Sequence, residues 1–210
     1  MTTIYIIRHG ESTHNAGIFK GEKLHEIPLT ETGKKQAEKV AQKLKNIHFD
    51  VIFSSHYVRA QETAKIIANS IKLEHKVSST IHERIFGDNY YKNRETVRAK
   101  MKEIFKKFSD KEKLQYKYSQ DMESSQQEAE RLMTFIKKVT DEYAGKTIMI
   151  VCHGNIMRSL LNLLGWCKFD ELPERAIENT GYIRLETNGT KLLVTETFGV
   201  YKQTGVERIT

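Results

Sequence analysis

Three short apolar runs, each followed by a helical pattern, constrain the fold of this chain more than any other feature. The runs are TIYIIRH (3–9), DVIFSS (50–55) and KTIMIVCH (146–153). Continuous apolar runs of this length are typical of strands that are buried on both faces by covering helices. The sequence therefore predicts an α/β fold in which helices alternate with the strands of a mostly parallel sheet.

Apolar residues at helical spacing indicate where the covering helices lie. They predict helices over 33–47, 59–71, 95–108, 126–143 and about 155–165. Thr30 is the expected N-cap of the first helix, with Thr32 as the rival choice. A further short strand is expected near 77–81, and the polar stretch 109–125 is the least ordered by composition.

The end of the chain has the pattern of a β-hairpin. GYIRLET and KLLVTETF are joined at Asn188-Gly189, and an Asn-Gly dipeptide is a strong hairpin signal. The hairpin adds an antiparallel edge to the sheet. Because the sequence contains no internal repeat, linker or second core pattern, we expect one domain over 1–210, with a lid or insertion at about 84–125.

Charge and cysteine content bear on the class of partner. The net charge is +7, and residues 92–117 alone hold ten Lys or Arg against four Asp or Glu. This local excess suits an anionic small substrate or a solvated helix face, and no nucleic-acid-binding motif accompanies it. No apolar run is long enough for a membrane span, the N-terminus does not resemble a signal peptide, and Cys152 and Cys167 form no disulfide framework. We expect a cytoplasmic protein without nucleic-acid or membrane partners.

Polar side chains follow each of the three strands. The first strand ends in Arg8-His9-Gly10-Glu11-Ser12, the second in Ser54-Ser55 with Arg59 one helical turn later, and the third in His153-Gly154-Asn155. In such a sheet, ligands bind beyond the carboxyl ends of the strands, so these groups are expected to share one crevice. Imidazole is a possible nucleophile toward phosphorus, arginine matches phosphate oxygens, and glycine lets a ligand approach the backbone.

Each of these residues also has a structural interpretation. Arg59 alone fits an ion pair on a helix face, and His153 alone fits a core histidine with satisfied hydrogen bonds. Their joint placement at three strand ends favours a common site. Because no carboxylate cluster or HExxH spacing accompanies the histidines, we expect neither a metal nor another cofactor.

Five segments in the same order resemble the histidine phosphatase superfamily, the phosphoglycerate mutase-like group. They are IYIIRHGESTHN, LTETGKKQA, FSSHYVRAQETA, IHERIFG and IVCHGN. The resemblance implies a three-layer α/β/α sandwich and a transient phosphohistidine on His9. It also implies that Arg8, Arg59 and His153 hold the phosphoryl group, and that Asn15 contacts phosphate.

The resemblance assigns further roles that the residues alone do not indicate. Glu83 matches the family's acidic residue that passes protons, although by itself it reads as a solvated glutamate. Ser12 and Gly21 fall in the substrate-side loop, and Asn155 follows the second histidine as in several members. Glu123-Ser124 resembles a Gly-Glu-Ser element of the family with Met122 in place of glycine, and its role stays open.

Two departures from the family pattern concern the substrate. His14 stands where the family often has tryptophan, and is expected to be a loop side chain without essential chemistry. The run Asp88-Asn89-Tyr90-Tyr91-Lys92 replaces a frequent Glu-Gly pair in the lid. We therefore expect the lid, through Tyr90, Tyr91, Lys92 and Arg94, to choose among small phosphorylated substrates.

The predicted function is hydrolysis of a phosphomonoester through His9. The first alternative is phosphoglycerate mutase-type phosphoryl transfer, whose enzymes carry a Trp-Arg-Arg run in a longer lid. The single tryptophan here, Trp166, lies outside the lid, which favours a phosphatase. The second alternative is a non-catalytic phospho-ligand binding protein, which loss of His9, Arg59, Glu83 or His153 would indicate, and all four are present. The sequence indicates neither the physiological substrate nor an oligomeric state.

Overall fold

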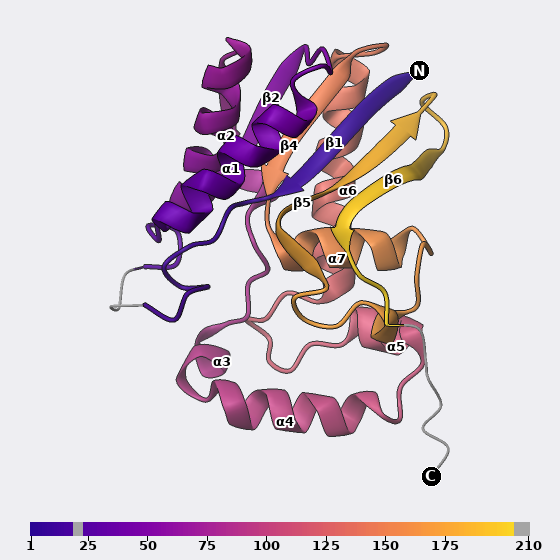
Figure 1. The fold of residues 1–210 in the computed structure, drawn as a ribbon. Coiled ribbons are helices and arrows are strands. Elements are labelled where there is room, and N and C mark those ends of the chain that lie inside the picture. Colours follow the sequence, from indigo (N-terminus) through magenta and orange to yellow (C-terminus); the bar gives the residue numbers. More distant parts are fainter. Residues whose placement is uncertain (19–22, 204–210) are drawn as a thin grey trace.

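A six-stranded sheet with the order β3-β2-β4-β1-β5-β6 forms the centre of the computed structural model, which describes residues 1–18 and 23–203 (Figure 1). The strands are β1 (Thr2–Arg8), β2 (Val51–Ser55), β3 (His75–Ser78), β4 (Thr147–Cys152), β5 (Ile177–Thr187) and β6 (Leu192–Val200). Strands β1 to β4 run parallel to one another, whereas β5 pairs antiparallel with β1 and with β6. The predicted parallel sheet with an antiparallel edge hairpin is confirmed.

Helices cover both faces of the sheet because the strands are apolar on both sides. Tyr5 and Ile7 of β1 pack toward α1 (Glu31–Leu44) and α2 (Val58–Ile71). Ile4 and Ile6 belong to the other core, which includes residues of α6 (Ser125–Glu142) and α7 (Gly154–Leu163). The result is the predicted three-layer α/β/α sandwich.

The segment 84–125 lies beyond the carboxyl ends of the parallel strands, where Figure 1 shows its helices below the sheet. They are α3 (Asp88–Lys92), α4 (Arg94–Phe105) and α5 (Asp110–Gln115). A small core of Tyr90, Val97 and Met122 holds this segment together.

The expectation that 109–125 is the least ordered stretch is wrong for its first half. Ser109 begins α5 with a capping box: its hydroxyl accepts from the Glu112 amide, and the Glu112 carboxylate accepts from the Ser109 amide. Lys113 of this helix is buried and pairs with Asp170 of the 3-10 helix η2 (Phe169–Glu171), with Nζ 2.5 Å from Oδ2. The prediction failed because a polar helix stabilised by capping and one long-range ion pair has little apolar periodicity.

Other element boundaries agree with the predictions to within a few residues, with one shift. The strand expected near 77–81 is β3 at His75–Ser78, because Ser78 caps the 3-10 helix η1 (Ser79–Ile81). Thr30 is the N-cap of α1, accepting from the Gly33 amide at 3.0 Å. Within the described residues, no helix has the length and apolar character needed to cross a membrane.

Candidate active site

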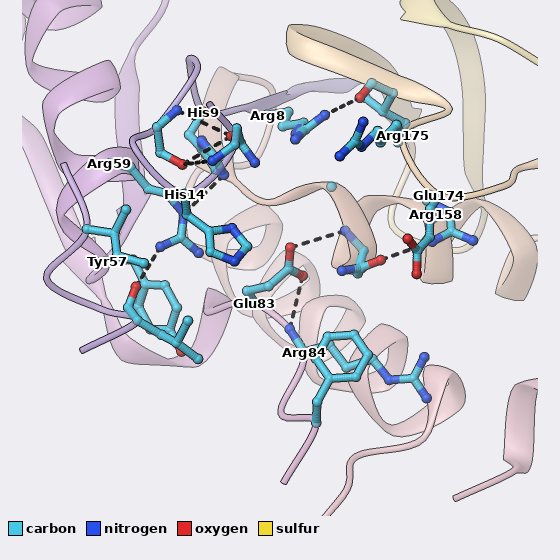
Figure 2. Close-up of a pocket in the computed structure, with 18 of the residues that line it drawn as sticks. Arg8, His9, His14, Tyr57, Arg59, Glu83, Arg84, Arg158, Glu174 and Arg175 are labelled. Atoms are coloured by element: carbon cyan, nitrogen blue, oxygen red, sulfur yellow. Dashed lines mark hydrogen bonds between the residues drawn. The ribbon is translucent and has the colours of Figure 1, made fainter. Parts of the chain in front are cut away.

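A cavity of about 240 Å³ opens at the carboxyl ends of the parallel strands (Figure 2). Residues from all three strand ends, from the loops after α7 and before α2, and from the segment 84–125 form its walls. The lining includes Arg8, His9, Ser12, His14, Asn15, Tyr57, Arg59, Glu83, Arg84, Tyr90, Tyr91, Arg94, Gly154, Asn155, Arg158, Glu174 and Arg175. Parallel strands explain this convergence, because their carboxyl ends meet at one edge of the sheet.

His9 is a buried imidazole in a single tautomer. Its Nδ1 lies 2.6 Å from the carbonyl oxygen of Gly10, which only accepts, so Nδ1 carries the proton. Its Nε2 then accepts a hydrogen bond from Arg59 Nε at 3.1 Å. Burial, reinforced by the charges of Arg59 and Arg8, holds the pKa of His9 well below its usual range. The ring is therefore neutral and presents a lone pair on Nε2.

A close contact between two glycines positions the loop after His9. A Cβ on Gly10 would lie 2.4 Å from the Gly33 oxygen, and a Cβ on Gly33 would lie 2.0 Å from the Glu11 oxygen. Only glycine at both positions lets the first turn of α1 pack against this loop. This contact gives a physical reason for the glycine in the LTETGKKQA segment.

Two arginines flank His9 at the floor of the cavity. Arg8 is held by a hydrogen bond from Nη1 to the Ile177 oxygen at 2.5 Å, and its Nε is buried without a partner among the described residues. Arg59 donates from Nη1 to the Leu24 oxygen at 2.6 Å and stacks on the Tyr57 ring at 4.8 Å. Both guanidinium groups are fixed by protein contacts and retain donors for an anion.

His153 lies next to His9, although it is not among the residues that line the cavity. It is fully buried, its ring centroid is 5.2 Å from that of His9, and its Nε2 contacts Ser55 Oγ at 2.9 Å. Burial, with Arg59 and His9 as further causes, lowers the pKa of His153 well below its usual range. Gly154 and Asn155 follow it at the first turn of α7 and line the cavity.

Glu83 enters the cavity from the loop after η1, opposite His9 (Figure 2). Its carboxylate accepts long hydrogen bonds from the amides of Asn155 and Ile156, at 3.4 and 3.3 Å, and a shorter one from Arg84 at 3.0 Å. The N-terminus of α7 thus orients this carboxyl group. The structure brings Glu83 to the same cavity as His9, although the two are far apart in sequence.

Asn15 is oriented by a network that the sequence does not reveal. Its Oδ1 accepts from the Ser12 amide at 3.3 Å, from Ser12 Oγ at 3.1 Å and from Asn179 Nδ2 at 3.3 Å. The side-chain Nδ2 of Asn15 makes no hydrogen bond with another described residue, so it can donate to a ligand. Gly21, the remaining predicted site residue, lies outside the described residues.

Asn179 and Thr180 of β5 support the backbone of the nucleophile candidate. Asn179 Nδ2 donates to the His9 oxygen at 3.0 Å, and the Thr180 amide donates to the same oxygen at 3.4 Å. Thr180 has φ 60°, an unfavourable conformation for a β-branched residue, where the β5–β6 register shifts. No local sequence signal marks this pair, because the contact is made across 170 residues.

Several lining side chains were absent from the predicted site. Arg158, one turn after Gly154 on α7, could have been found from helical spacing. Tyr57, Arg84, Glu174 and Arg175 carry no pattern that distinguishes them from other surface residues. His14, expected as a loop side chain, is on a loop and also lines the cavity, where burial and then Arg94 and Arg59 lower its pKa.

The Glu123-Ser124 element stabilises the fold beside the site. Ser124 caps α6, accepting from the Gln127 amide while the Gln127 side chain accepts from the Ser124 amide. Glu123 pairs with Arg131 at 2.9 Å, and Arg131 Nη1 donates to the carbonyl oxygens of Thr80 and His82 at 2.6 and 3.1 Å. These contacts fix the segment that leads into Glu83.

Comparison with known proteins agrees with this geometry. The family model of the histidine phosphatase superfamily, branch 1, matches residues 4–197. The chain belongs to the histidine phosphatase superfamily. Proteins similar to this superfamily member include phosphatases and phosphoglycerate mutases.

Individual relatives cover most of the chain. The uncharacterized phosphatase PhoE of Bacillus subtilis is 30% identical over 161 residues, 77% of this chain and 76% of that protein. Phosphoglycerate mutase of Schizosaccharomyces pombe is 30% identical over 187 residues, 83% and 84% of the two chains. A mutant phosphoserine phosphatase of Entamoeba histolytica, solved in complex with phosphoserine, has a TM-score of 0.72 and 26% identity over 94% of this chain and 97% of that one. Members of the superfamily are enzymes, so this histidine phosphatase superfamily protein is a phosphatase or a mutase.

Proposed function

We propose that this protein hydrolyses phosphomonoesters through a phosphohistidine on His9. The observation that carries the proposal is the neutral, buried His9, whose Nε2 accepts a hydrogen bond from Arg59 and whose pKa is lowered by burial and then by the charges of Arg59 and Arg8. A lone pair beside fixed cations is the arrangement that nucleophilic attack on a phosphate dianion requires.

In the first step His9 Nε2 attacks phosphorus in line with the ester oxygen. The Nε2–P bond forms as the P–O bond breaks, and Arg8, Arg59 and His153 stabilise the charge on the equatorial oxygens. Arg59 Nε donates to Nε2 of His9, and it exchanges this contact for a phosphoryl oxygen during the reaction. Asn15 donates its amide to the same group.

Glu83 moves the protons in both steps. Its carboxyl group protonates the leaving alkoxide oxygen in the first step. In the second step its carboxylate accepts a proton from the water that attacks phosphorus, and the Nε2–P bond breaks to release phosphate. The contacts from the first turn of α7 keep the carboxyl group within the cavity for both transfers.

Phosphoryl transfer back to a phosphoglycerate is the second candidate function. Relatives include mutases as well as phosphatases, and the same His9 chemistry serves both. A Trp-Arg-Arg run like that of the mutases would have to lie in the lining of the catalytic cavity to reach the substrate. The tryptophan of this chain, Trp166, lies instead beside α5 and η2, which favours hydrolysis. A non-catalytic phospho-ligand binding protein would retain phosphate affinity without turnover.

We propose further that the segment 84–125 is a lid of one domain over 1–210, and that the substrate is a small phosphorylated molecule. The lid places Tyr90, Tyr91 and Arg94 in the cavity wall, which supports a role in substrate choice. The two cysteines are unpaired, in keeping with a reducing, cytoplasmic compartment. We propose that neither a nucleic acid nor a membrane is a partner of this protein.

Turnover of a phosphomonoester panel tests the proposal, with mutase activity assayed alongside and a chelator present or absent. We expect hydrolysis that a chelator leaves unchanged, and loss of at least roughly 10³-fold in the His9→Ala variant. Rapid quenching is expected to trap phosphate on His9 in an acid-labile, base-stable form. Near-normal turnover by His9→Ala would exclude the phosphohistidine, and activity restored by a divalent ion after chelation would exclude the metal-free mechanism.

A further inference from the structure

The chain leaves β6 as a short segment, residues 201–203, which we call the strap, and this segment packs against the loop before β5. In Figure 1 it runs from the end of β6 toward α5. The Tyr201 amide donates to the Ala176 oxygen at 2.8 Å, which continues the antiparallel β5–β6 pairing by one more hydrogen bond. The Gln203 amide donates to the Glu171 oxygen at 2.9 Å. Two main-chain hydrogen bonds therefore join the strap to this loop.

Lys202 fastens the middle of the strap to the turn after α7. Its Nζ donates to the Trp166 oxygen at 2.7 Å and lies 3.8 Å from the centroid of the Trp166 ring. The ammonium group is attracted by the face of the indole. Although all three strap residues are exposed, they contact the turn after α7, the helix η2 and the residue before β5. The strap thus spans the whole connection between α7 and β5.

Two carbonyl oxygens of the same connection hold arginines of the catalytic cavity. The Leu172 oxygen accepts from Arg158 Nε at 2.8 Å, and the Ile177 oxygen accepts from Arg8 Nη1 at 2.5 Å. Leu172 and Ile177 each lie one residue after a carbonyl that the strap holds. Because peptide groups are planar and neighbours share a Cα, fixing one carbonyl restricts the direction of the next. The strap is not part of the cavity lining, so it acts on these arginines from outside the cavity.

Arg175 lies between the two strap contacts and has a strained backbone. Its φ is 67°, a left-handed conformation that is unfavourable for a residue with a Cβ. Such a conformation persists only where the surrounding structure fixes the backbone. The hydrogen bond from the strap to Ala176, the next residue, is one such contact, and the Ala176 amide also donates to the Pro173 oxygen at 3.1 Å. The loop therefore needs support from outside to keep its shape.

We infer that the strap positions Arg8 for the transferred phosphoryl group, by fixing the loop whose Ile177 oxygen holds the guanidinium. Arg158 is held in the same manner through Leu172. This role rests on the proposed function, in which Arg8 stabilises the phosphoryl oxygens, and it adds positioning residues to that reaction. A guanidinium that can turn away forms fewer paired hydrogen bonds with phosphate, so loss of the strap weakens phosphate binding without removing a cation.

A matched pair of substitutions at Tyr201 tests this role. Tyr201→Pro removes the N–H that the Ala176 oxygen accepts, whereas Tyr201→Ala loses the same ring and keeps the N–H. Val200 has the extended backbone of a strand, which a following proline allows. Relative to Tyr201→Ala, we expect Tyr201→Pro to raise the Kd of inorganic phosphate, measured by calorimetry, about fivefold. Its kcat/KM is expected to fall about tenfold for alkyl and aryl phosphates alike, because the lost contact acts on the group that both share.

The same pair in an Arg8→Gln background separates positioning from a general loss of stability. There we expect the two Tyr201 variants to bind phosphate with Kd values within about twofold, because the guanidinium that the strap positions is absent. Lys202→Met is a second, milder variant that removes the contacts with Trp166 and is expected to raise the Kd of phosphate about threefold. Lys202→Arg keeps a cation over the ring and is expected to retain the native value.

Equal phosphate Kd and kcat/KM in Tyr201→Pro and Tyr201→Ala would overturn the inference. An undiminished difference between them in the Arg8→Gln background would do the same, since the strap would then act on something other than Arg8. If Tyr201→Pro does not fold, a native phosphate Kd in Lys202→Met is the overturning result. Strap-dependent phosphate binding without hydrolysis of any ester would support the positioning role and overturn the proposed function, whereas absence of phosphate binding by the native protein would overturn both.

Discussion

At the scale of single residues, the chemistry depends on how a few polar atoms are oriented. The Gly10 carbonyl fixes the proton of His9 on Nδ1, and burial keeps the ring neutral. The Asn15 side chain is oriented in the same way, by three donors to its Oδ1. In both residues a hydrogen bond to the protein decides which atom is left for the substrate, so removal of the orienting group is expected to impair turnover without removing a reacting group.

Replacement of Glu83 by Gln tests the proton-transfer role. The variant keeps the shape and one acceptor oxygen for the amides at the first turn of α7, but it supplies no acidic proton. We expect turnover to fall by roughly 10²–10³-fold for alkyl phosphates, whose leaving alkoxides require protonation, and by less than about tenfold for an activated aryl phosphate. Steady-state kinetics on the two substrate types measures this, and equal losses would remove Glu83 from the general-acid role.

Asn179 is expected to act as a positioning residue. Asn179→Ala removes the donor to the His9 oxygen and to Asn15, and is expected to lower kcat by about tenfold with a smaller change in KM. Thr180→Gly is the matched comparison, because it keeps the backbone N–H that faces His9 and relieves the left-handed strain at φ 60°. We expect that variant to retain most of its activity and to melt at an equal or higher temperature. An inactive Thr180→Gly with an active Asn179→Ala would contradict this assignment.

At the scale of elements, the helices α3 to α5 bring a second set of side chains to the cavity. Their own core is small, and the segment is tied to the rest of the molecule by Lys113–Asp170, by Arg98–Glu174 and by the Glu123 contacts near Glu83. The positive charge of this segment is not uniform in its effect. Arg94 lines the cavity, whereas Lys92 is exposed and is not among the lining residues.

We therefore expect substitutions of Arg94 and of Lys92 to have different effects on KM, although each removes one positive charge. Arg94→Gln is expected to raise KM for doubly anionic phosphomonoesters several-fold, by about 1 kcal/mol of binding free energy or less, because the lost charge lies at the cavity. Lys92→Gln is expected to leave KM within about twofold at 0.1 M salt, where exposed charges are screened beyond roughly 10 Å. Kinetics of both variants at low and high ionic strength is the measurement. Equal changes of KM in the two variants would indicate that the positive charge of segment 84–125 belongs to a solvated surface without a role in substrate binding.

At the scale of the whole molecule, one buried acid couples stability to pH. Glu128 of α6 is fully buried, and its Oε2 accepts from Ser159 Oγ of α7 at 2.7 Å. Burial, then the negative charge of Glu83, raises the pKa of Glu128 well above its usual range. Since the folded state binds this proton more tightly than the unfolded state, the contribution to stability is full below the unfolded pKa near 4.5 and is lost as pH rises through the folded pKa.

Glu128→Gln is the test of that coupling. Glutamine keeps an acceptor for Ser159 and does not ionise. The free energy of unfolding of the variant, relative to that of the native protein, is therefore expected to increase as pH rises from about 5 to 8. A gain of about 1 kcal/mol corresponds to roughly 2–4 °C in melting temperature for a chain of this size. Glu130→Gln, an exposed carboxylate on the same helix, is the control and is expected to show a flat difference. A pH-independent difference for Glu128→Gln would show that Glu128 is ionised in the folded protein.

The sequence by itself determined the strands, most helices and which strand-end residues lie together at the cavity. Apolar runs and helical spacing reflect near-neighbour geometry, and the strand ends at His9, Arg59 and His153 meet because parallel strands share one carboxyl edge. The helix α5 was not predicted, because it is stabilised by a capping box and one long-range ion pair and shows little apolar periodicity. Glu83 entered the site only through the family resemblance, since no local pattern separates it from a solvated glutamate.

Only the tertiary structure decided the walls of the cavity. Arg175 and Thr180 adopt left-handed backbones although neither is a glycine. At Thr180 the backbone N–H donates to the His9 oxygen, a contact made far along the chain. The burial that keeps His9 and His153 neutral likewise depends on packing among elements from both ends of the chain. Local sequence encodes which elements form, whereas the protonation state and direction of each polar group follow from the distant residues that surround it.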